Sequence, residues 1–308
     1  MINIVLLDAL TFGETDLSGF DELGSVAVYQ TTTLDETLAR IKDAEVVVTN
    51  KVVITAEMMD ASVNLKLICI AATGMNNVDL EYAKAKNITV KNVAGYSTDS
   101  VIQHTFSMLF YMMGHSRYYD EYVKSGEWQK SPVFTNVTQP YAEVSGKRWG
   151  IIGMGAIGRG VAQIAKAFGA EVVYHSTSGR NSKSEFEQVS LSTLLETCDI
   201  ITIHAPLNAQ TQDLIGRDEL SSMKDGAVLL NLGRGGIVVE RELAEVLDEK
   251  EIYIGLDVLA KEPMTNPHPL MDVKHQERLY ITPHIAWASV EAREKLIAMV
   301  IDNIRTTL

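Results

Sequence analysis

Cysteine is scarce in this chain, which holds only Cys69 and Cys198 among its 308 residues. Each lies in or beside a short apolar run, and the two form no C-x-x-C pair. The pattern predicts two buried thiols and argues against a disulfide framework or a cysteine-ligated zinc site. We expect no metal site, and the low cysteine content suits a reducing compartment.

Positive charge is also in the minority, because 27 Lys and Arg residues stand against 40 Asp and Glu, a formal net charge of −13 at pH 7. A chain this acidic is a poor candidate for neutralising phosphates, so we expect no nucleic-acid partner. No apolar run reaches the roughly 18 residues of a membrane span. No Lys or Arg precedes Arg40, which argues against a signal peptide. We therefore expect a cytoplasmic protein that does not bind membranes.

The composition is otherwise ordinary, with 46% hydrophobic and 22% charged residues, which argues against disorder. At about 150 residues per domain, the length suggests two domains. Short apolar runs alternate with segments of helical period along the chain. In the first third they predict strands at residues 2–7, 26–29, 46–49, 67–71 and 88–90, with helices at 34–42 and 78–86.

A second array of the same kind begins near Arg148. Its predicted strands are 149–152, 172–174, 200–204, 227–231, 252–257 and 279–282. The helices between them are predicted near 158–168, 191–197, 217–223 and 240–248. This alternation predicts an α/β fold of two doubly wound parallel sheets with right-handed crossovers.

Three further segments join or flank the arrays. Residues 100–118 are apolar and rich in Met, and they predict one buried connecting helix. Residues 130–146 contain two prolines and predict a loop. Residues 289–304 predict an amphipathic helix with Ser289 as its N-cap.

A glycine-rich loop, Gly153-Met154-Gly155-Ala156-Ile157-Gly158, follows the predicted strand 149–152 and opens a helix. Gly153 permits a tight turn, Gly155 lets the backbone approach a pyrophosphate, and Gly158 lets strand and helix pack closely. The diphosphate would bind at the helix N-terminus, where N–H groups and the macrodipole favour anions. The strand–turn–helix context predicts a dinucleotide site rather than a glycine turn without a ligand.

The position that selects the ribose lies about 20 residues beyond this loop. The chain there contains Ser176, Thr177 and Arg180, with no Asp or Glu at the turn. A carboxylate would accept from the ribose hydroxyls, whereas Arg180 can donate to a 2′-phosphate. The loop favours NADP(H) over NAD(H), and the alternative is that Arg180 is a solvated loop residue.

Arg234, Glu262 and His284 each come shortly after one of the last three predicted strands. Because the carboxyl ends of parallel strands meet at one edge of a sheet, we expect these side chains near one another, where ligands bind. Each has a plain alternative, since a loop Arg or Glu is usually solvated and a His after Pro often occupies a turn. Their arrival at one edge, beside a nucleotide loop, favours a functional site.

Together the three residues suit hydride transfer to a 2-keto acid. An Arg fork can hold the substrate carboxylate or keto oxygen and polarise the carbonyl. An imidazole ordinarily titrates near neutral pH, so it can protonate the developing alkoxide. A neighbouring carboxylate would orient it and stabilise the imidazolium. A nicotinamide would supply the hydride.

The ordered motifs resemble those of the D-isomer-specific 2-hydroxyacid dehydrogenases over nearly the whole chain. Besides the glycine loop they are Ala72-Thr73-Gly74-Met75-Asn76-Asn77-Val78-Asp79, His204-Ala205-Pro206-Leu207, Asn231-Leu232-Gly233-Arg234-Gly235, Asp257-Val258 with Glu262-Pro263, and Pro283-His284-Ile285-Ala286-Trp287. The resemblance implies that Arg234, Glu262 and His284 are the catalytic trio. Formate dehydrogenases of the same superfamily typically carry Gln where this chain has Glu262, which counts against formate.

The resemblance also implies which residues bind the ligands. The backbone N–H groups of Gly74 and Met75 would hold the substrate carboxylate. Other substrate contacts would come from Asn50, Lys51, Thr73, Trp287, Arg234 and His284. The cofactor would contact Gly153, Gly155, Ala156, Ile157, Gly158, Ser176, Thr177, Arg180, His204, Ala205, Pro206, Thr211, Leu232, Gly233, Asp257 and Thr105. Gln103 stands where Glu is common in the family.

The implied topology is two Rossmann-like domains with a cleft between them. Residues 1–99 and 287–308 would form a flavodoxin-like substrate domain, and residues 100–286 the dinucleotide-binding domain. Family members are usually dimers through the nucleotide domain, which predicts a homodimer interface within residues 100–141. The loop at Ser176 and the run after Pro283 look most like glycerate dehydrogenases, also called hydroxypyruvate reductases. They imply a small 2-keto or 2-hydroxy acid as substrate.

Three other functions stay open. A 3-phosphoglycerate dehydrogenase would need a phosphate site, yet the segments around Asn50 and Thr73 offer little cation beyond Lys51. A D-lactate-type dehydrogenase is compatible with the sequence. A nucleotide-sensing corepressor on the same fold can retain the trio, but such proteins usually add flexible tails, which we do not expect here.

Overall fold

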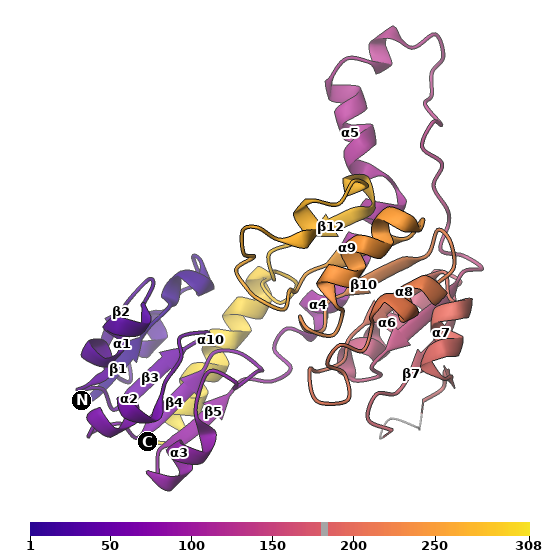
Figure 1. The fold of residues 1–308 in the computed structure, drawn as a ribbon. Coiled ribbons are helices and arrows are strands. Elements are labelled where there is room, and N and C mark those ends of the chain that lie inside the picture. The colour runs from indigo at the N-terminus through magenta and orange to yellow at the C-terminus, as the bar shows by residue number, and fades with distance from the viewer. Residues whose placement is uncertain (180–183) are drawn as a thin grey trace. The chain divides into compact units, whose positions relative to one another are not determined.

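The computed structural model describes residues 1–179 and 184–308, which form two compact units. Unit 1 comprises Met1–Ser97 and Trp287–Leu308, and unit 2 comprises Thr98–Ala286. Each unit is built on one sheet of parallel strands (Figure 1). No helix within the described ranges has both the length and the hydropathy to cross a membrane.

Unit 1 has a five-stranded sheet in the order β2-β1-β3-β4-β5, with every pair parallel. Its strands are β1 Ile2–Leu6, β2 Gly24–Val28, β3 Val46–Thr49, β4 Leu67–Ile70 and β5 Thr89–Asn92. Its helices are α1 Leu34–Ile41, α2 Ala56–Ala61, α3 Leu80–Ala85 and α10 Val290–Arg305, with the 3-10 helices η1 Ala9–Phe12 and η2 Ser18–Phe20. The predicted N-cap of α10 is confirmed, because the Ser289 hydroxyl accepts the N–H of Ala292 at 3.1 Å.

Unit 2 has a seven-stranded sheet in the order β12-β11-β10-β9-β6-β7-β8, again with every pair parallel. Its strands are β6 Arg148–Ile152, β7 Glu171–His175, β8 Glu187–Gln188, β9 Ile200–Ile203, β10 Val228–Asn231, β11 Tyr253–Leu256 and β12 Leu279–Ile281. Its helices are α4 Thr98–Met113, α5 Ser116–Lys124, α6 Ala156–Ala167, α7 Leu191–Thr197, α8 Arg217–Ser222 and α9 Glu240–Glu249. Short 3-10 turns complete it at η3 Trp128–Lys130, η4 Pro269–Met271 and η5 Gln276–Arg278.

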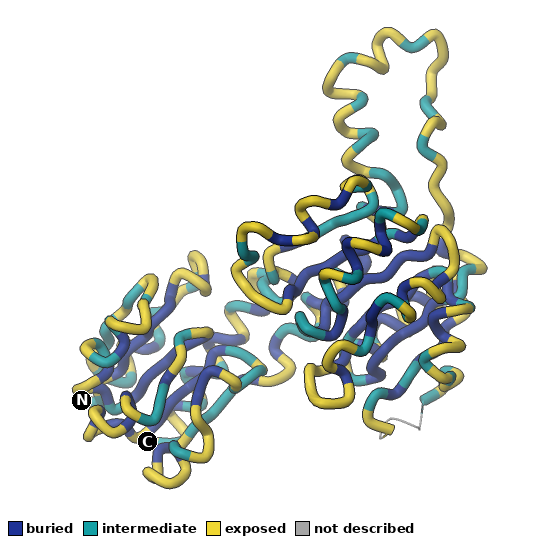
Figure 2. The backbone as a smooth tube through the Cα atoms, viewed as in Figure 1, coloured by how far each residue is buried: buried dark blue, intermediate teal, exposed yellow. Residues whose placement is uncertain are grey.

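The central strands are buried on successive residues, as unbroken apolar runs predict for strands covered on both faces. Every residue of β3, β4, β9 and β10 is buried, and the dark blue centre of each sheet shows this in Figure 2. Both cysteines are buried, and burial raises the pKa of Cys69 to about 12 and that of Cys198 to about 11. The predicted α/β class with two parallel sheets is confirmed.

The connecting segment differs from the sequence prediction of one helix over residues 100–118. The structure ends α4 at Met113 and starts α5 at Ser116, and His115 between them has a φ of 46°. Seven residues of α4 are buried, whereas α5 has no buried residue. The core that shapes α4 therefore ends at the break, and α5 and the chain after it project from unit 2 (Figure 1).

Candidate active site

The three predicted catalytic side chains lie on loops that follow adjacent strands of unit 2. Arg234 follows β10, Glu262 follows β11 and His284 follows β12. These strands are hydrogen-bonded parallel neighbours, so their loops leave the sheet at the same edge. The structure thus gathers the three loops at the carboxyl edge, which is where open α/β sheets bind ligands.

His284 and Glu262 form a hydrogen-bonded pair. Nδ1 of His284 lies 2.6 Å from Oε2 of Glu262, whose Oε1 accepts the N–H of Leu259 at 2.9 Å. An ionised carboxylate only accepts, so Nδ1 carries the hydrogen, and Nε2 has no hydrogen-bond partner in the described part of the chain. The two side chains are 25% and 32% exposed. An imidazole oriented by a carboxylate, with its second nitrogen accessible, is the arrangement of a general acid.

Asp257, directly after β11, holds the backbone around His284. Its carboxylate accepts from Oγ1 of Thr282 at 2.6 Å, the N–H of Ile285 at 2.9 Å and the N–H of Ala286 at 3.0 Å. Its carbonyl accepts the N–H of His284 at 2.8 Å. His284 has a φ of 52°, a left-handed conformation that is costly for a residue with a side chain. These hydrogen bonds hold that conformation in place and fix the backbone position from which the imidazole extends.

His104 of α4 extends the network behind this loop. Its Nε2 lies 3.2 Å from Oγ1 of Thr282 and 3.7 Å from Oδ1 of Asp257. The Thr282 hydroxyl donates to Asp257, so His104 is the donor to Thr282. Burial lowers the pKa of His104, while the negative charge of Asp257 acts in the opposite direction. His104 is therefore a neutral hydrogen-bond donor at pH 7.

Arg234 lies in a turn closed by the buried Asn231 at the end of β10. Oδ1 of Asn231 accepts the N–H of Gly233 at 3.0 Å, and its Nδ2 donates to the carbonyl of Arg234 at 2.9 Å. Nη1 of Arg234 donates to the carbonyl of Gly233 at 2.8 Å. Within the described ranges no carboxylate forms an ion pair with the guanidinium, which leaves its other donors for an anionic ligand.

The glycine loop has the features of a pyrophosphate cradle. Gly153 has a φ of 98°, and a Cβ there would lie 2.9 Å from both the N of Ala205 and the carbonyl oxygen of His204. A Cβ on Gly155 would meet no atom within 4 Å, so the backbone borders open space. No side chain of the described residues caps the N-terminus of α6. Its first N–H groups are thus available to an anion, and the residues present fit a dinucleotide diphosphate.

The end of β7 fits contact with the ribose. Ser176 is buried, and its Oγ has no hydrogen-bond partner among the residues that the structure describes. Buried hydroxyls are normally paired, so an unpaired one at this strand end points to a polar ligand. Thr177 follows and is half-buried. Arg180, on which the NADP(H) prediction depends, lies outside the described residues.

The remaining predicted cofactor contacts lie near the same edge of the sheet. Oγ1 of Thr211 donates to the carbonyl of Pro206 at 2.6 Å and closes the loop after β9. Oγ1 of Thr105 donates to the carbonyl of Val101 at 2.8 Å within α4. Both hydroxyls are engaged within the protein but keep lone pairs that can accept. The other predicted contacts, on the loops after β9 and β10 and on α6, are Ala205, Leu232, Gly233, Ala156, Ile157 and Gly158.

His204, directly after β9, carries an imidazole whose two nitrogens are buried and have no partner among the described residues. Its N–H donates to the carbonyl of Ile152 at 2.8 Å, which anchors its backbone beside the glycine loop. Both ring nitrogens are shielded from solvent and have no hydrogen-bond partner among the described residues. Burial lowers the pKa of His204 from 6.5 to about 3. The ring is therefore neutral in the folded protein at neutral pH.

This burial predicts a specific loss of stability in mild acid. The unfolded chain binds a proton at His204 near pH 6.5, whereas the folded chain does so only near pH 3. Stability must therefore fall as the pH falls from 6.5 toward 3, by about 1.4 kcal/mol per unit, or about 2 kcal/mol between pH 6.5 and pH 5. We expect His204→Phe to reduce the difference between urea unfolding free energies at pH 7 and pH 5 by this amount. The exposed-site variant His275→Ala should keep the wild-type difference, and equal differences in all three proteins would contradict the prediction.

The predicted substrate residues of unit 1 lie on loops after two adjacent strands. The buried Asn50 follows β3, and Thr73, Gly74 and Met75 follow β4. No described residue accepts a hydrogen bond from the N–H of Gly74 or Met75. Two neighbouring backbone donors that have no partner among the described residues are suited to a carboxylate.

Trp287 lies in unit 1, where it packs edge-on against Tyr96 with their ring centroids 6.2 Å apart. It is half-buried and joins the hydrophobic core between the sheet and α10. Trp287 therefore has a packing role in unit 1.

Sequence reasoning missed three residues that support the loops of unit 2. His104 was visible only as a polar residue within an apolar helix. Glu240, the first residue of α9, accepts the N–H of Ala260 and pairs with the buried His268 at 3.1 Å. His268 lies on the loop that carries Glu262, and Glu240 lies on α9 beside that loop. In the sequence, an acidic residue at the start of a helix suggests only a favourable interaction with the helix dipole, so it gave no sign of this contact.

Comparisons with known proteins place these features in a family. A family model described as the NAD-binding domain of D-isomer-specific 2-hydroxyacid dehydrogenases matches residues 106–286. The hydroxypyruvate reductase of Blautia hydrogenotrophica is 34% identical over 317 residues, which cover 100% of this chain and 97% of that protein. The glycerate dehydrogenase of Methylorubrum extorquens is 36% identical over 278 residues, covering 90% of this chain and 87% of that protein.

A solved structure shows the same architecture. The structure of an acyclic imino acid reductase in complex with NADPH and D-Arg is 30% identical, with a TM-score of 0.85, and covers 99% of this chain and 96% of that one. The predicted Rossmann-like α/β architecture and the predicted family are both confirmed. The chain belongs to the D-isomer-specific 2-hydroxyacid dehydrogenases, and it is an oxidoreductase that uses a nicotinamide cofactor.

Proposed function

We propose that this enzyme reduces hydroxypyruvate and glyoxylate to the corresponding 2-hydroxy acids in the cytoplasm, with NADP(H) as its preferred cofactor. The observation that carries the proposal is the His284–Glu262 pair, 2.6 Å apart, on strand-end loops beside the loop of Arg234. Relatives named hydroxypyruvate reductase and glycerate dehydrogenase match 100% and 90% of the chain, which supports the choice of substrate.

The residues of this chain divide the reaction between them. The bound nicotinamide supplies a hydride to the carbonyl carbon of the keto acid. Arg234 binds the keto acid through its guanidinium and polarises the carbonyl, which lowers the cost of negative charge on the oxygen. His284 donates a proton from Nε2 to that oxygen, and Glu262 stabilises the imidazolium through Nδ1. The product is the 2-hydroxy acid, and His284 is left neutral.

The two units take different parts of this task. Unit 2 carries the glycine loop and binds the dinucleotide, with Asp257 and the loops after β9 and β10 as further contacts. Unit 1 binds the substrate carboxylate through the N–H groups of Gly74 and Met75, with Asn50 and Thr73 as neighbours. The preference for NADP(H) is supported by the absence of Asp and Glu from the turn after β7. It is also supported by the Ser176 hydroxyl, which has no partner among the described residues, and by the NADPH complex of the imino acid reductase.

Initial rates test this function. Hydroxypyruvate, glyoxylate, pyruvate and 3-phosphohydroxypyruvate are each reduced in parallel with NADPH and with NADH. We expect the highest kcat/KM for hydroxypyruvate, with glyoxylate next and NADPH preferred. A preference for pyruvate would indicate a D-lactate-type enzyme, and a preference for the phosphorylated acid a 3-phosphoglycerate dehydrogenase. Binding of NADPH without turnover of any keto acid would favour a nucleotide-sensing protein.

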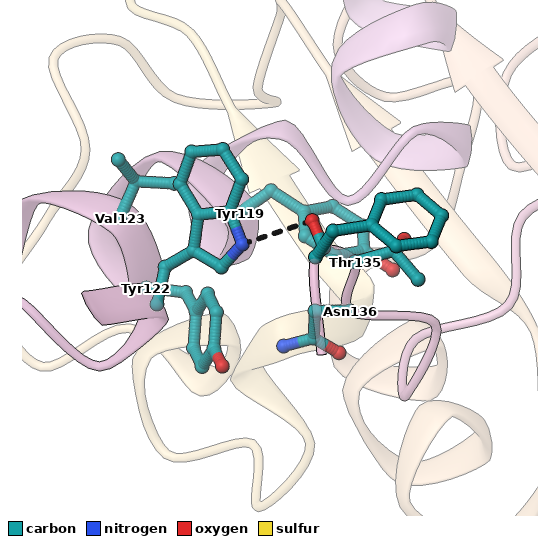
Figure 3. Close-up of a pocket in the computed structure, with 7 residues that line it drawn as sticks. Tyr119, Tyr122, Val123, Thr135 and Asn136 are labelled. Carbon is teal, nitrogen blue, oxygen red and sulfur yellow. Dashed lines mark hydrogen bonds between the residues drawn. The ribbon is translucent and has the colours of Figure 1, made fainter. Parts of the chain in front are cut away.

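The projecting segment of unit 2 supports a homodimer. The arm, residues 116–141, exposes six large apolar or aromatic side chains: Val123, Trp128, Val133, Phe134, Val137 and Tyr141. Between α5 and the returning chain the arm forms an open pocket of about 170 Å³, beside which Nε1 of Trp128 donates to the carbonyl of Phe134 at 3.2 Å (Figure 3). Apolar surface concentrated in this way marks an interaction site. We assign it to a second copy of the chain.

A charge on the arm should separate the two copies. Phe134 is 88% exposed, so Phe134→Glu should not disturb the fold of the isolated chain, yet it would place a carboxylate within an apolar interface. We expect light scattering after gel filtration to give twice the mass of the chain for the wild type and the mass of one chain for the variant. Val63→Glu, a change at a residue of unit 1 that is 84% exposed, should remain dimeric. A dimer that persists in Phe134→Glu and Val137→Glu would place the interface elsewhere.

A further inference from the structure

A buried carboxylate in unit 1 organises the loop after β3. Asp8 follows β1 and is only 6% exposed. It accepts three successive backbone N–H groups: Asn50 at 2.9 Å, Lys51 at 2.7 Å and Val52 at 3.3 Å. Successive N–H groups that converge in this way form an anion-binding concavity. Here the anion is the carboxylate of Asp8, which lies 42 residues before Asn50 in the sequence.

The same turn is tied to the second substrate loop of unit 1. Oγ1 of Thr49 accepts the N–H of Val52 at 2.9 Å, and the carbonyl of Val52 accepts Nδ2 of Asn77 at 3.0 Å. Asn77 belongs to the segment that contains Gly74 and Met75, and it is 7% exposed. A connected set of buried and partly buried hydrogen bonds thus runs from Asp8 through residues 49–52 to the loop after β4.

The hydrogen bonds of Asp8 also decide which donors remain for a substrate. The N–H groups of Asn50 and Lys51 are directed at the Asp8 carboxylate, and that of Val52 is shared between Asp8 at 3.3 Å and Oγ1 of Thr49 at 2.9 Å, so none of the three is free to bind a second anion. The N–H groups of Gly74 and Met75 have no such partner among the described residues. A buried carboxylate is costly unless its hydrogen bonds are satisfied, so the turn and Asp8 hold each other in one geometry.

We propose that Asp8 is a positioning residue for keto-acid binding: it fixes the turn at residues 49–52, and through Asn77 the loop of Gly74 and Met75. The proposal rests on the function proposed above. Because Asp8 is only 6% exposed and its carboxylate is bonded to N–H groups of the turn, it acts on the substrate through that turn. Its loss should therefore weaken binding of the keto acid while leaving the chemistry of His284 intact. In kinetic terms KM rises and kcat does not change.

Asp8→Asn tests this with little change of shape. The amide keeps one acceptor oxygen and directs an NH₂ group at backbone donors. We expect the KM for hydroxypyruvate to rise about tenfold, with kcat and the Kd for NADPH within about twofold of wild type. Asp16→Asn removes the same charge from an exposed Asp that also accepts a backbone N–H, from Ser18 at 2.9 Å, and should behave as wild type.

Hydrogen exchange of peptides that cover residues 49–53 and 72–78 provides a second readout, measured without substrate. We expect faster exchange in both peptides of Asp8→Asn and wild-type exchange in Asp16→Asn. Faster exchange together with a raised KM supports the proposal. An unchanged KM despite faster exchange overturns it, as does unchanged exchange. Because exchange is read without turnover, a wild type that reduces no keto acid would reject the proposed function separately from the role of Asp8 in the turn.

Discussion

Replacing His284 with Ala should lower kcat for keto-acid reduction by about 10³-fold, within the range that a positioned general acid contributes. The imidazole is the group in unit 2 whose Nε2 can deliver a proton to the reduced carbonyl, since Nδ1 is held by Glu262 at 2.6 Å. Binding of the nucleotide should be unaffected, because the glycine loop follows a different strand. Single-turnover reduction and the Kd for NADPH, measured by fluorescence, check both parts of the prediction.

His275→Ala is a matched control for this variant. His275 also bonds a carboxylate through Nδ1, that of Glu277 at 3.1 Å, but it directly precedes η5 and its side chain is 39% exposed. This pair has the chemical groups of the catalytic pair without its position at the carboxyl edge. We expect its loss to leave kcat unchanged. If both variants keep wild-type turnover, the proton comes from another group and His284 has only a structural role.

The geometry explains why so large an effect is expected from one side chain. His284 has a φ of 52°, and Asp257 holds the residues on both sides of it. A general acid is effective only when its donor nitrogen lies within hydrogen-bond reach of the reacting oxygen. The chain therefore maintains a costly backbone conformation at His284, and this conformation holds the imidazole in one position.

The sequence was sufficient to predict that the loops of Arg234, Glu262 and His284 meet at one edge of the sheet, because that placement depends only on the parallel order of the strands before them. Each of Arg234, Glu262 and His284 follows an apolar run, and parallel strands bring such positions together whatever their side chains contact. Most of the helices that cover the sheets were predicted from the period of their apolar residues, but α2 at Ala56–Ala61 was not. The roles assigned to these residues remain predictions until the variants are measured.

One missed feature did have a local signal. The break at His115 coincides with the end of the core beneath α4, and Gly114 with the polar residues 115–117 interrupts the apolar run at the same point, which the prediction of one helix over 100–118 did not use. The other missed features depend on contacts that no local pattern encodes. Asp8 reaches a turn 42 residues away, and His104 meets Thr282 across 178 residues. Buried polar groups of this kind are recognised only when the partners that satisfy them are visible. The sequence predicts which loops bind ligands, but the hydrogen bonds that hold those loops are visible only in the structure.

Arg234→Gln should lower kcat/KM for hydroxypyruvate by about 10³-fold through both KM and kcat. The guanidinium forms no ion pair with a described carboxylate, and its turn is fixed by Asn231. A charge with two parallel donors binds the keto acid and also stabilises the oxygen as it gains negative charge, so its loss affects the ground state and the transition state together. Initial rates over a range of hydroxypyruvate concentrations separate the two contributions.

Two further variants identify which property of the guanidinium matters. Arg234→Lys keeps the positive charge but loses the planar fork, so we expect it to recover part of kcat while KM remains high. Arg241→Gln removes an Arg whose side chain is 84% exposed on α9 and should match the wild type. If Arg234→Lys had full activity, a point charge would be sufficient, and the hypothesis that the substrate is bound by two parallel donors would be wrong. If Gln left kcat/KM unchanged, the substrate anion would have to be bound by other groups, and the backbone donors of Gly74 and Met75 would then be the first to examine.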